Sequence, residues 1–407
     1  MKIKKYIPKL LLDSLRPIYH WCLSWLTAYY YDLPGHKLRI IAVTGTKGKT
    51  TVVVMLKAIF ETAGYQTATS SSLGFSIHNK NWPNQLKMTM PGPLYLQKFL
   101  WQAQQAKVDF VIMEVTSEGI AQYRLNGIKP ETAVMTNVRP EHLESHGSFQ
   151  AYLEAKQQLF NQTRDYHVLN AEDPHLQDFT QNSAVKTITY GQQLGHVNKV
   201  TKALKLSLLG NFNETNALAT LAVAEIYAIP SDQALAALAK ITIIPGRMER
   251  IKTKTGFEII IDYAHTPDSL TKVYEDLRTR SQGRLLCVLG SAGGGRDRWK
   301  RPLFGKLAQH YCDEVIFTNE DPYDERPETI IAEIISELNT KPQNWQIIID
   351  RKQAIANILA KAKPGDTVVI TGKGSELSMA LANDQLLDWS DKETVIKILD
   401  PLKQKSI

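Results

Sequence analysis

Residues Thr44 to Thr51 form a run of glycine, threonine and lysine with the composition of a phosphate-binding loop. Glycines let backbone N–H groups turn toward phosphate oxygens, Lys49 can bring a positive charge to the terminal phosphates, and Thr50 can offer a hydroxyl to Mg²⁺. The first glycine of the general pattern would fall where this chain has Val43, so the loop is a narrower variant. A glycine-rich turn that binds no phosphate is the alternative, and the position of the loop between a strand and a helix disfavours it.

Three further residues carry side chains that could assist phosphate chemistry. Glu114 ends an apolar run, and ligands of open α/β sheets bind at the carboxyl ends of strands, where a carboxylate can hold Mg²⁺. His142 stands in a polar loop, and Lys156 follows on a helical pattern. Taken alone, they are better interpreted as a solvated carboxylate, a structural histidine and a surface lysine. Their assignment therefore depends on the motifs around them.

The elements that must position these residues follow from the hydrophobic pattern. Short apolar runs predict buried strands, and runs with helical spacing predict the helices between them, as in a parallel α/β sheet. In the first part of the chain we expect strands at 38–43, 108–115, 132–136 and 166–170, and helices at 51–63 and 148–160.

The same pattern restarts near residue 244. We expect strands at 258–262, 284–289, 314–318, 345–350 and 366–371, and a helix at 267–280. The sequence therefore predicts an α/β protein, with a central P-loop ATPase domain that has a mostly parallel sheet and a C-terminal Rossmann-like doubly wound domain. The predicted ranges are 1–37 for a short helical N-terminal segment, 38–243 for the central domain and 244–407 for the C-terminal domain.

The N-terminal segment is rich in Leu, Trp and Tyr from residue 7 to residue 31. Charged residues such as Asp13 and Arg16 interrupt it, so neither a secretory signal nor a spanning helix fits. The favoured interpretation is a pair of short helices packed on the body of the protein. The alternative is an amphipathic segment that makes peripheral contact with a membrane, since basic residues flank it and its aromatic residues suit a lipid interface.

Composition points to a soluble globular protein that attracts anions. Of the 407 residues, 43% are hydrophobic and 22% charged, which argues against extensive disorder, and the formal net charge is +7. Nucleotide phosphates are as good a reason for this charge as nucleic acid, and without an Arg-rich tract we expect no nucleic-acid binding. Cys22, Cys287 and Cys312 form no CxxC pair. We therefore expect a cytoplasmic protein in a reducing compartment, with all three as buried thiols.

The phosphate loop Gly45-Thr46-Lys47-Gly48-Lys49-Thr50-Thr51 resembles that of the Mur ligase superfamily, which also includes folylpolyglutamate synthases. Two more segments support this resemblance. Residues 113–117 resemble the E-V-S-S element of the family, and residues 136–147 resemble T-N-x-x-x-D-H-L-D-x-H-G, with Glu141 and Glu144 in place of aspartates. The resemblance implies a Mg²⁺ site in which Lys156 is carbamylated by CO₂, which turns a cation into an anionic ligand. The implied metal ligands are Thr50, Glu114, His142 and Lys156.

Four further segments resemble the nucleotide-binding motifs of the family. They are residues 209–219, with an N-x-x-N spacing, residues 245–250, residues 262–268, which read D-Y-A-H-T-P-D, and the glycine-rich residues 290–302. Asn side chains can read an adenine edge, although two Asn near a helix start could instead be caps. The implied ATP-binding residues are Gly45, Thr46, Lys47, Gly48, Lys49, Thr50, Thr51, Asn213, Asn216, Arg247, Asp262 and His265.

The remaining motifs concern the two other substrates. The resemblance implies that the acceptor is bound by Thr89, Pro91, Ser117, Gln122 and Arg124, with Glu118 where the family usually has His. It implies that the added amino acid is bound by Asp321, Pro322, Tyr323, Gly374 and Glu376. Tyr323 replaces the Arg that holds the distal carboxylate of meso-diaminopimelate in other members. The acidic residues around it favour a cationic side chain such as lysine.

The resemblance therefore implies an ATP-dependent ligase that adds an amino acid, with lysine favoured, to a UDP-N-acetylmuramoyl dipeptide through an acyl phosphate. Its implied catalytic residues are Lys49, Glu114, His142, Lys156 and Arg247, its cofactors are ATP and Mg²⁺, and we expect a monomer. Only 37 residues precede the first predicted strand, so the segment 1–37 would be a reduced form of the domain that binds uridine in the family. The alternatives are a ligase for folate or another carboxylate acceptor, and a nucleotide-binding regulator without catalysis.

Overall fold

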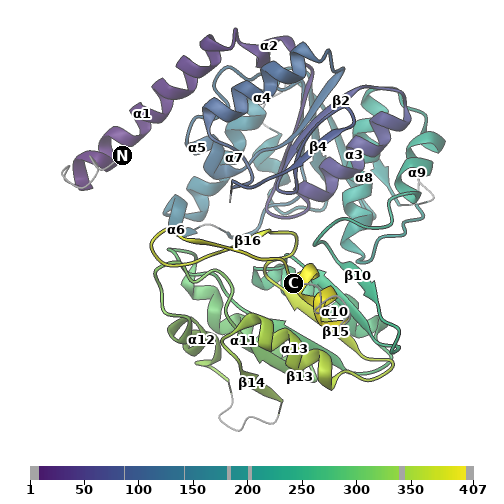
Figure 1. Ribbon diagram of the computed structural model, residues 1–407. Coiled ribbons are helices and arrows are strands. Elements are labelled where there is room, and N and C mark those ends of the chain that lie inside the picture. The colour runs from purple at the N-terminus through teal and green to yellow at the C-terminus, as the bar shows by residue number, and fades with distance from the viewer. Residues whose placement is uncertain are drawn as a thin grey trace. The chain divides into compact units, whose positions relative to one another are not determined.

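The chain forms two compact units, each with its own β-sheet (Figure 1). The computed structural model describes residues 9–86, 88–141, 143–180, 185–199, 204–338 and 344–399. The first unit comprises Met1–Leu206 and Asn213–Ile241, and the second comprises Ser207–Phe212 and Thr242–Ile407. Each unit is described below by itself.

The first unit contains a nine-stranded sheet in the order β4-β3-β2-β5-β1-β6-β7-β8-β9. The strands from β2 to β9 in this order run parallel to their neighbours, whereas β3 and β4 join antiparallel at one edge. The parallel strands at the centre are wholly buried and rich in Val, Ile and Met, as expected for a sheet covered on both faces. The strands are β1 (Ile40–Thr44), β2 (Thr67–Ser71), β3 (Gly74–Ile77), β4 (Lys80–Pro83), β5 (Phe110–Glu114), β6 (Thr132–Met135), β7 (Tyr166–Asn170), β8 (Lys186–Gly191) and β9 (Val197–Asn198).

Helices cover both faces of this sheet, with α3, α8 and α9 on one side and α4, α5 and α7 on the other (Figure 1). Their ends follow from local sequence: the side chain of Ser148 accepts a hydrogen bond from Ala151 N at the start of α7, and Pro93 occupies the first turn of α4. The helices are α1 (Lys9–Tyr30), α2 (Pro34–Lys37), α3 (Lys49–Thr62), α4 (Pro93–Gln105), α5 (Ser117–Ala121), α6 (Leu143–His146), α7 (Phe149–Gln162), the 3₁₀ helix η2 (Leu176–Phe179), α8 (Phe212–Ile226) and α9 (Ser231–Ala239).

The second unit contains a six-stranded sheet in the order β10-β11-β15-β12-β13-β14, parallel except for β10, and a separate β16–β17 hairpin. Alternate residues of its strands enter two cores, one formed with α10, α11 and α12 and the other with α13 and α14. The strands are β10 (Glu249–Lys252), β11 (Glu258–Asp262), β12 (Leu285–Leu289), β13 (Glu314–Phe317), β14 (Trp345–Ile347), β15 (Thr367–Thr371), β16 (Ser378–Ala380) and β17 (Leu386–Asp388). The helices are α10 (Pro267–Arg280), η3 (Arg298–Lys300), α11 (Arg301–Tyr311), α12 (Pro327–Ile335), α13 (Arg351–Lys361) and α14 (Asp391–Leu399).

The predicted fold class is confirmed, because both units have mostly parallel sheets covered by helices. The favoured prediction for the N-terminal segment was wrong in detail. Instead of a pair of short helices, α1 is one helix of 22 residues that continues through Pro17, and only the four-residue α2 follows it. No helix within the described residues is both long enough and apolar enough to cross a bilayer.

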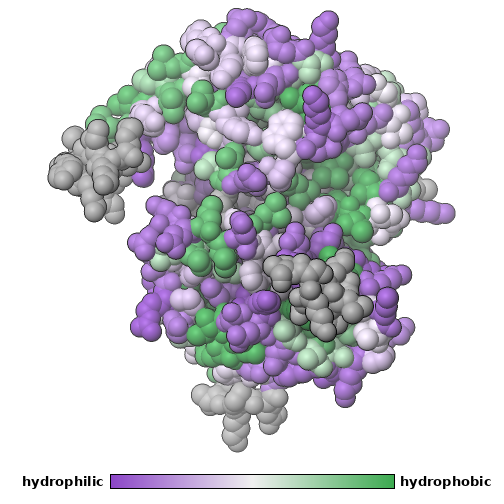
Figure 2. All heavy atoms as spheres, in the orientation of Figure 1, coloured by the Kyte–Doolittle hydropathy of each residue, from purple (hydrophilic) through white to green (hydrophobic). Residues whose placement is uncertain are grey.

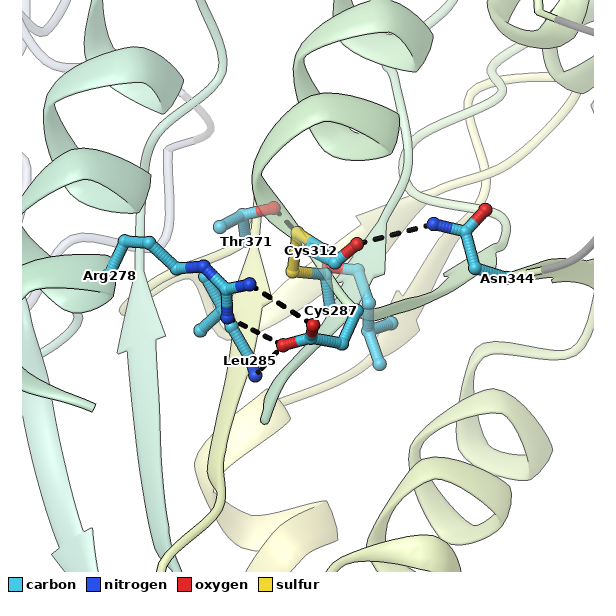
Figure 3. Close-up of a disulfide and its surroundings, with 8 residues drawn as sticks. Arg278, Leu285, Cys287, Cys312, Asn344 and Thr371 are labelled. Atoms are coloured by element: carbon cyan, nitrogen blue, oxygen red, sulfur yellow. Dashed lines mark hydrogen bonds and ion pairs between the residues drawn. A yellow bond between two sulfur atoms is a disulfide. The ribbon is translucent and has the colours of Figure 1, made fainter. Parts of the chain in front are cut away.

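The prediction of three buried thiols was also wrong. Cys287 of β12 and Cys312, which follows α11, form a disulfide in the core of the second unit (Figure 3). The thiol of Cys22 is free and exposed on α1. The sequence could not show this pairing, because 25 residues separate the two cysteines and only the packing of α11 against the sheet brings them together.

Candidate active site

The phosphate loop leaves β1 at the carboxyl edge of the first sheet, where β1 lies between β5 and β6. Gly45 and Gly48 have φ angles of 143° and 88°, which glycine adopts without steric cost. The backbone N–H of Thr46 donates to Asn137 O at 2.8 Å, and the N–H of Lys47 donates to Asn137 Oδ1 at 3.0 Å. The predicted loop therefore has the strand–loop–helix geometry of a phosphate site, and Asn137 fixes its shape.

Two lysines converge on one carbonyl of this loop. The ammonium of Lys49 donates to Gly45 O at 2.8 Å, and that of Lys156, which lies on α7, donates to the same oxygen at 3.2 Å. Lys156 is 1% exposed and lies 4.5 Å from the centre of the Tyr152 ring. Burial lowers the pKa of Lys156 well below its ordinary value, and the nearby charge of Lys49 lowers it further. The environment therefore favours a neutral amine, which is the form that reacts with CO₂.

Glu114 lies beside the loop because β5 pairs with β1 in a register that sets Val43 opposite Glu114. The Glu114 carboxylate is buried and accepts a hydrogen bond from Ser72 N at 3.1 Å. The hydroxyl of Thr50 lies 2.9 Å from that of Ser72. Carboxylate and hydroxyl oxygens are the ligands that Mg²⁺ prefers, so the donor set at this edge fits the expected ion.

The predicted metal site is only partly described. His142 lies outside the described residues, so its role as a ligand stays a prediction. Among the residues that the structure describes, no three His, Cys, Asp or Glu side chains converge as a metal site. The neighbouring Glu141 is buried and forms an ion pair with Lys47 at 2.8 Å, which ties the segment before His142 to the phosphate loop.

Asn213 and Asn216 lie at the start of α8 and against the phosphate loop. Both are buried, and the Asn216 amide donates to Asn213 Oδ1 at 3.1 Å. Asn216 packs directly on Gly48, since a Cβ atom at that glycine would lie 2.3 Å from Asn216 Oδ1. The structure therefore brings these two residues to the loop that the sequence assigned to the phosphates.

Four of the five residues predicted to bind the acceptor, Thr89, Pro91, Gln122 and Arg124, lie in segments that the structure joins in the first unit. The Arg124 guanidinium donates to Met90 O, between Thr89 and Pro91, and to Gln122 Oε1 at 2.6 Å. Arg124 thus joins the two segments that the sequence analysis assigned to one substrate. Ser117, at the start of α5, hydrogen-bonds to the ring of His146 at 3.1 Å.

In the second unit, Asp262 joins two loops that the sequence assigned to the nucleotide. One carboxylate oxygen accepts from Met248 N and the other from Ala264 N, each at 2.7 Å. Both oxygens are therefore used for structure, so Asp262 positions the backbone after β11.

Arg247 and His265 flank Tyr263 in the same loops. The Arg247 guanidinium lies 4.4 Å from the centre of the Tyr263 ring, and His265 Nδ1 lies 2.7 Å from Tyr263 O. The Tyr263 hydroxyl donates to Glu376 Oε1 at 3.1 Å. The charge of Glu376 and burial raise the pKa of Tyr263 well above its ordinary value, so this hydroxyl keeps its proton.

The centre of the cluster in the second unit is Lys373, a wholly buried lysine that was not among the predicted site residues. Lys373 donates to both oxygens of Asp321, at 2.9 and 2.8 Å, and to Glu376 Oε2. These carboxylates raise the pKa of Lys373 and hold it as a cation despite burial. The loop that contains Gly374 packs on the Arg247 turn, because a Cβ atom at Gly246 would lie 2.1 Å from Ser375 N.

This arrangement changes one argument from the sequence. The acidic residues around Tyr323 appeared suited to a cationic substrate, but two of them are already paired with cations of the chain. Asp321 binds Lys373, and Glu325 binds the wholly buried Arg301 at 2.9 Å. The Tyr323 backbone, at a φ of 50°, donates to Ala380 O, and Pro322 lies beside it, 2.3 Å from a Cβ atom built on Gly293. The carboxylates of Asp321 and Glu325 therefore stabilise the fold of this loop by pairing with cations of the chain.

Sequence reasoning missed Ser72 and gave Lys373 no role. Lys373 stands in the motif 372–376 between two residues that were assigned, so its position was a usable signal. Ser72 follows β2, an element that was not predicted, and nothing in its sequence context marks it.

Comparison with known proteins matches each of the two units to a domain of one protein family. The model of the Mur ligase middle domain matches residues 43–224, and the model of the Mur ligase glutamate ligase domain matches residues 246–374. A UDP-N-acetylmuramoyl-L-alanyl-D-glutamate–2,6-diaminopimelate ligase of Syntrophomonas wolfei is 34% identical over 401 residues, which cover 93% of this chain and 81% of that protein. The chain belongs to the Mur ligase family.

Two other relatives extend this match. A UDP-N-acetylmuramyl-tripeptide synthetase of a Roseiflexus species is 34% identical over 88% of this chain and 78% of its own length. A solved structure of a UDP-N-acetylmuramoyl-L-alanyl-D-glutamate–2,6-diaminopimelate ligase is 31% identical with a TM-score of 0.60, over 90% of this chain and 79% of that one. As a member of this family, the chain is an ATP-dependent ligase, and the predicted resemblance and enzyme class are confirmed.

Proposed function

We propose that this Mur ligase adds an amino acid to a UDP-N-acetylmuramoyl dipeptide in peptidoglycan precursor synthesis. The observation that carries the proposal is a wholly buried Lys156 that bonds to the phosphate loop and whose pKa burial lowers, in a chain that matches such ligases along 93% of its length. ATP transfers its terminal phosphoryl group to the acceptor carboxylate, and ADP leaves. The amine of the amino acid then attacks the acyl carbonyl, phosphate leaves, and the amide forms.

The first unit supplies the charges for phosphoryl transfer. The loop from Gly45 to Thr51 surrounds the phosphates with backbone N–H groups, and Lys49 neutralises the charge that develops on them. The neutral amine of Lys156 attacks CO₂ and releases a proton to solvent, which gives a carbamate whose single negative charge is shared by two oxygens. Thr50, Glu114, His142 and carbamylated Lys156 would hold Mg²⁺, which supplies positive charge to the phosphates when it is bound.

The two other substrates are assigned to separate clusters. Thr89, Pro91, Ser117, Gln122 and Arg124 bind the acceptor, supported by the bonds that join their two segments. In the second unit, Arg247 stabilises phosphate charge, and Glu376, which bonds to Tyr263, binds the incoming ammonium group. Lysine is the proposed amino acid, because Tyr323 cannot form a salt bridge with the distal carboxylate of diaminopimelate.

We further propose that the enzyme works in the cytoplasm, where ATP is available, and as a monomer. The range 38–243 serves ATP binding and 244–407 serves ligation. Analytical ultracentrifugation tests the monomer, which a concentration-dependent increase in mass would exclude.

The decisive experiment measures phosphate release from ATP with UDP-N-acetylmuramoyl-L-alanyl-D-glutamate and a panel of amino acids that includes lysine and meso-diaminopimelate. Release that requires both the acceptor and lysine is expected. Release with the acceptor and diaminopimelate, but not with the acceptor and lysine, would replace lysine by diaminopimelate as the added amino acid. Diaminopimelate is the substrate named for the Syntrophomonas relative. Bound ATP without release across the panel would contradict the proposed acceptor. A folate substrate and a non-catalytic regulator are then separated by adding dihydropteroate and glutamate.

A further inference from the structure

The N-terminal helix α1 turns its polar side toward the protein. Within residues 15–30, whose burial is described, Ser24, Thr27 and Ala28 are buried. The Ser24 hydroxyl accepts a hydrogen bond from Asn126 Nδ2 at 2.9 Å, and Ala28 packs on Gly127, where a Cβ atom would lie 2.6 Å from the Ala28 methyl group. An amphipathic helix of a globular protein normally buries its apolar side instead.

The opposite side of α1 is apolar and exposed. We call this surface the apolar face of α1; its side chains are between 50% and 78% exposed and recur at three- and four-residue spacing. Its members are Leu15, Ile18, Tyr19, Leu26, Tyr29 and Tyr30. Figure 1 shows α1 extending from the first unit beyond α2 and α4, and Figure 2 shows hydrophobic side chains along it. Single exposed apolar residues are ordinary, but a continuous face of this kind marks an interaction surface.

Charge and residue type identify the partner. The first 20 residues of the sequence contain Lys2, Lys4, Lys5, Lys9 and Arg16, with Asp13 as the only acid. An anionic lipid surface complements this charge, whereas a second copy of the chain carries the same charge. Tyr and Trp are the side chains that favour the membrane–water interface, and Trp21 and Trp25 accompany the three tyrosines on this helix.

We propose that α1 binds the surface of an anionic membrane and lies in the interface with its apolar face toward the acyl chains. The helix is already folded against the first unit through Ser24 and Ala28, so binding need not order it. Attachment through one helix is reversible and depends on salt, because part of the attraction is electrostatic. The inference is independent of the proposed ligase substrates.

The test is co-sedimentation of the full chain with phosphatidylcholine vesicles that do or do not contain phosphatidylglycerol. We expect binding to the anionic vesicles that falls at high salt, and Leu26→Asp to weaken it by about tenfold or more, since it places a charge among the acyl chains. Leu194→Asp is the matched control, because Leu194 is similarly exposed but lies in a loop of the same unit. It should bind like the unmodified protein, and both variants should keep ATP-dependent phosphate release.

Three results would overturn the proposal. The first is that the unmodified protein binds neither kind of vesicle. The second is that Leu26→Asp binds anionic vesicles as well as Leu194→Asp does. The third is that the unmodified protein binds neutral vesicles as tightly as anionic ones. Ultracentrifugation without lipid provides a separate check. A dimer that Leu26→Asp dissociates would assign the apolar face of α1 to a second copy of the chain.

Discussion

Each unit buries a lysine beside a glycine-containing loop, and the two lysines have opposite surroundings. Lys156 of the first unit faces Lys49 and a backbone carbonyl, and its pKa is lowered. Lys373 of the second unit faces Asp321 and Glu376, and its pKa is raised. Burial lowers the pKa of both lysines, so the charge of their neighbours explains why the two pKa values shift in opposite directions. The first environment suits a lysine that reacts, and the second suits a lysine that organises a loop cluster.

The largest effect is expected for Lys156→Met. Ligase activity should fall about 10³-fold, the scale seen when one preorganised electrostatic group is removed from an active site. Stability should change little, because methionine replaces a buried neutral amine with a side chain of similar length. Phosphate release in the presence of both substrates measures the loss, with Lys57→Met on α3 as the control.

A second measurement sharpens this prediction. If the carbamate is the active form, the unmodified enzyme should lose activity in CO₂-free buffer and recover it with bicarbonate, whereas the variant should not respond. Activity near normal in Lys156→Met would show that this lysine serves packing alone.

Lys373→Met should instead lower stability. It leaves the carboxylates of Asp321 and Glu376 in the second unit without their cation, and removing one partner of a buried ion pair typically costs about 3–5 kcal/mol. Urea unfolding measures this difference. The double variant Lys373→Met/Asp321→Asn should recover part of the loss, because it removes one uncompensated charge. A double variant less stable than the single one would show that repulsion between the carboxylates is not the cause.

The disulfide is a further difference between the units, since within the described residues only the second unit is cross-linked. Closing a loop of 25 residues stabilises a folded protein by about 3.5 kcal/mol in the chain-entropy model. Reductant should therefore lower the unfolding midpoint of the second unit and leave that of the first unchanged, with Cys22→Ser as a control. Thiol titration of the unreduced, denatured protein should count one thiol, and a count of three would contradict the disulfide.

The smallest effect concerns pH and Glu320, which packs on Gly372 beside the Lys373 cluster. Burial raises its pKa from 4.5 to about 7. Between these two pH values the folded protein holds a proton that the unfolded chain has released. The stability that comes from protonated Glu320 is therefore fully present below about pH 4.5 and is lost as pH rises through about 7.

Glu320→Gln removes this dependence. It should stabilise the protein by about 1–3 kcal/mol near pH 8 and have little effect near pH 5, because glutamine resembles the protonated side chain. Denaturant unfolding at the two pH values measures the difference. An effect of equal size at both would mean that Glu320 does not titrate in this range.

The sequence alone determined the fold class, the family and the most apolar of the parallel strands, whereas the parallel strands β2 and β8 were not predicted. Buried parallel strands are continuous apolar runs, and the loop from Gly45 to Thr51 needs glycine and lysine at fixed spacing, so both leave local signals. The edge strand β4 and its neighbour β3 left no such signal, because each has only four residues and β4 is mostly exposed and polar.

Only the tertiary structure decided the environment of each side chain. A lysine in a helix and a lysine in a glycine loop look equally solvated in sequence, yet Lys156 and Lys373 are both buried and oppositely perturbed. The pairing of Asp321 with Lys373, the disulfide and the outward apolar face of α1 likewise depend on contacts between distant segments. Electrostatic and packing energies depend on neighbours in space, and the order of residues along the chain does not specify those neighbours.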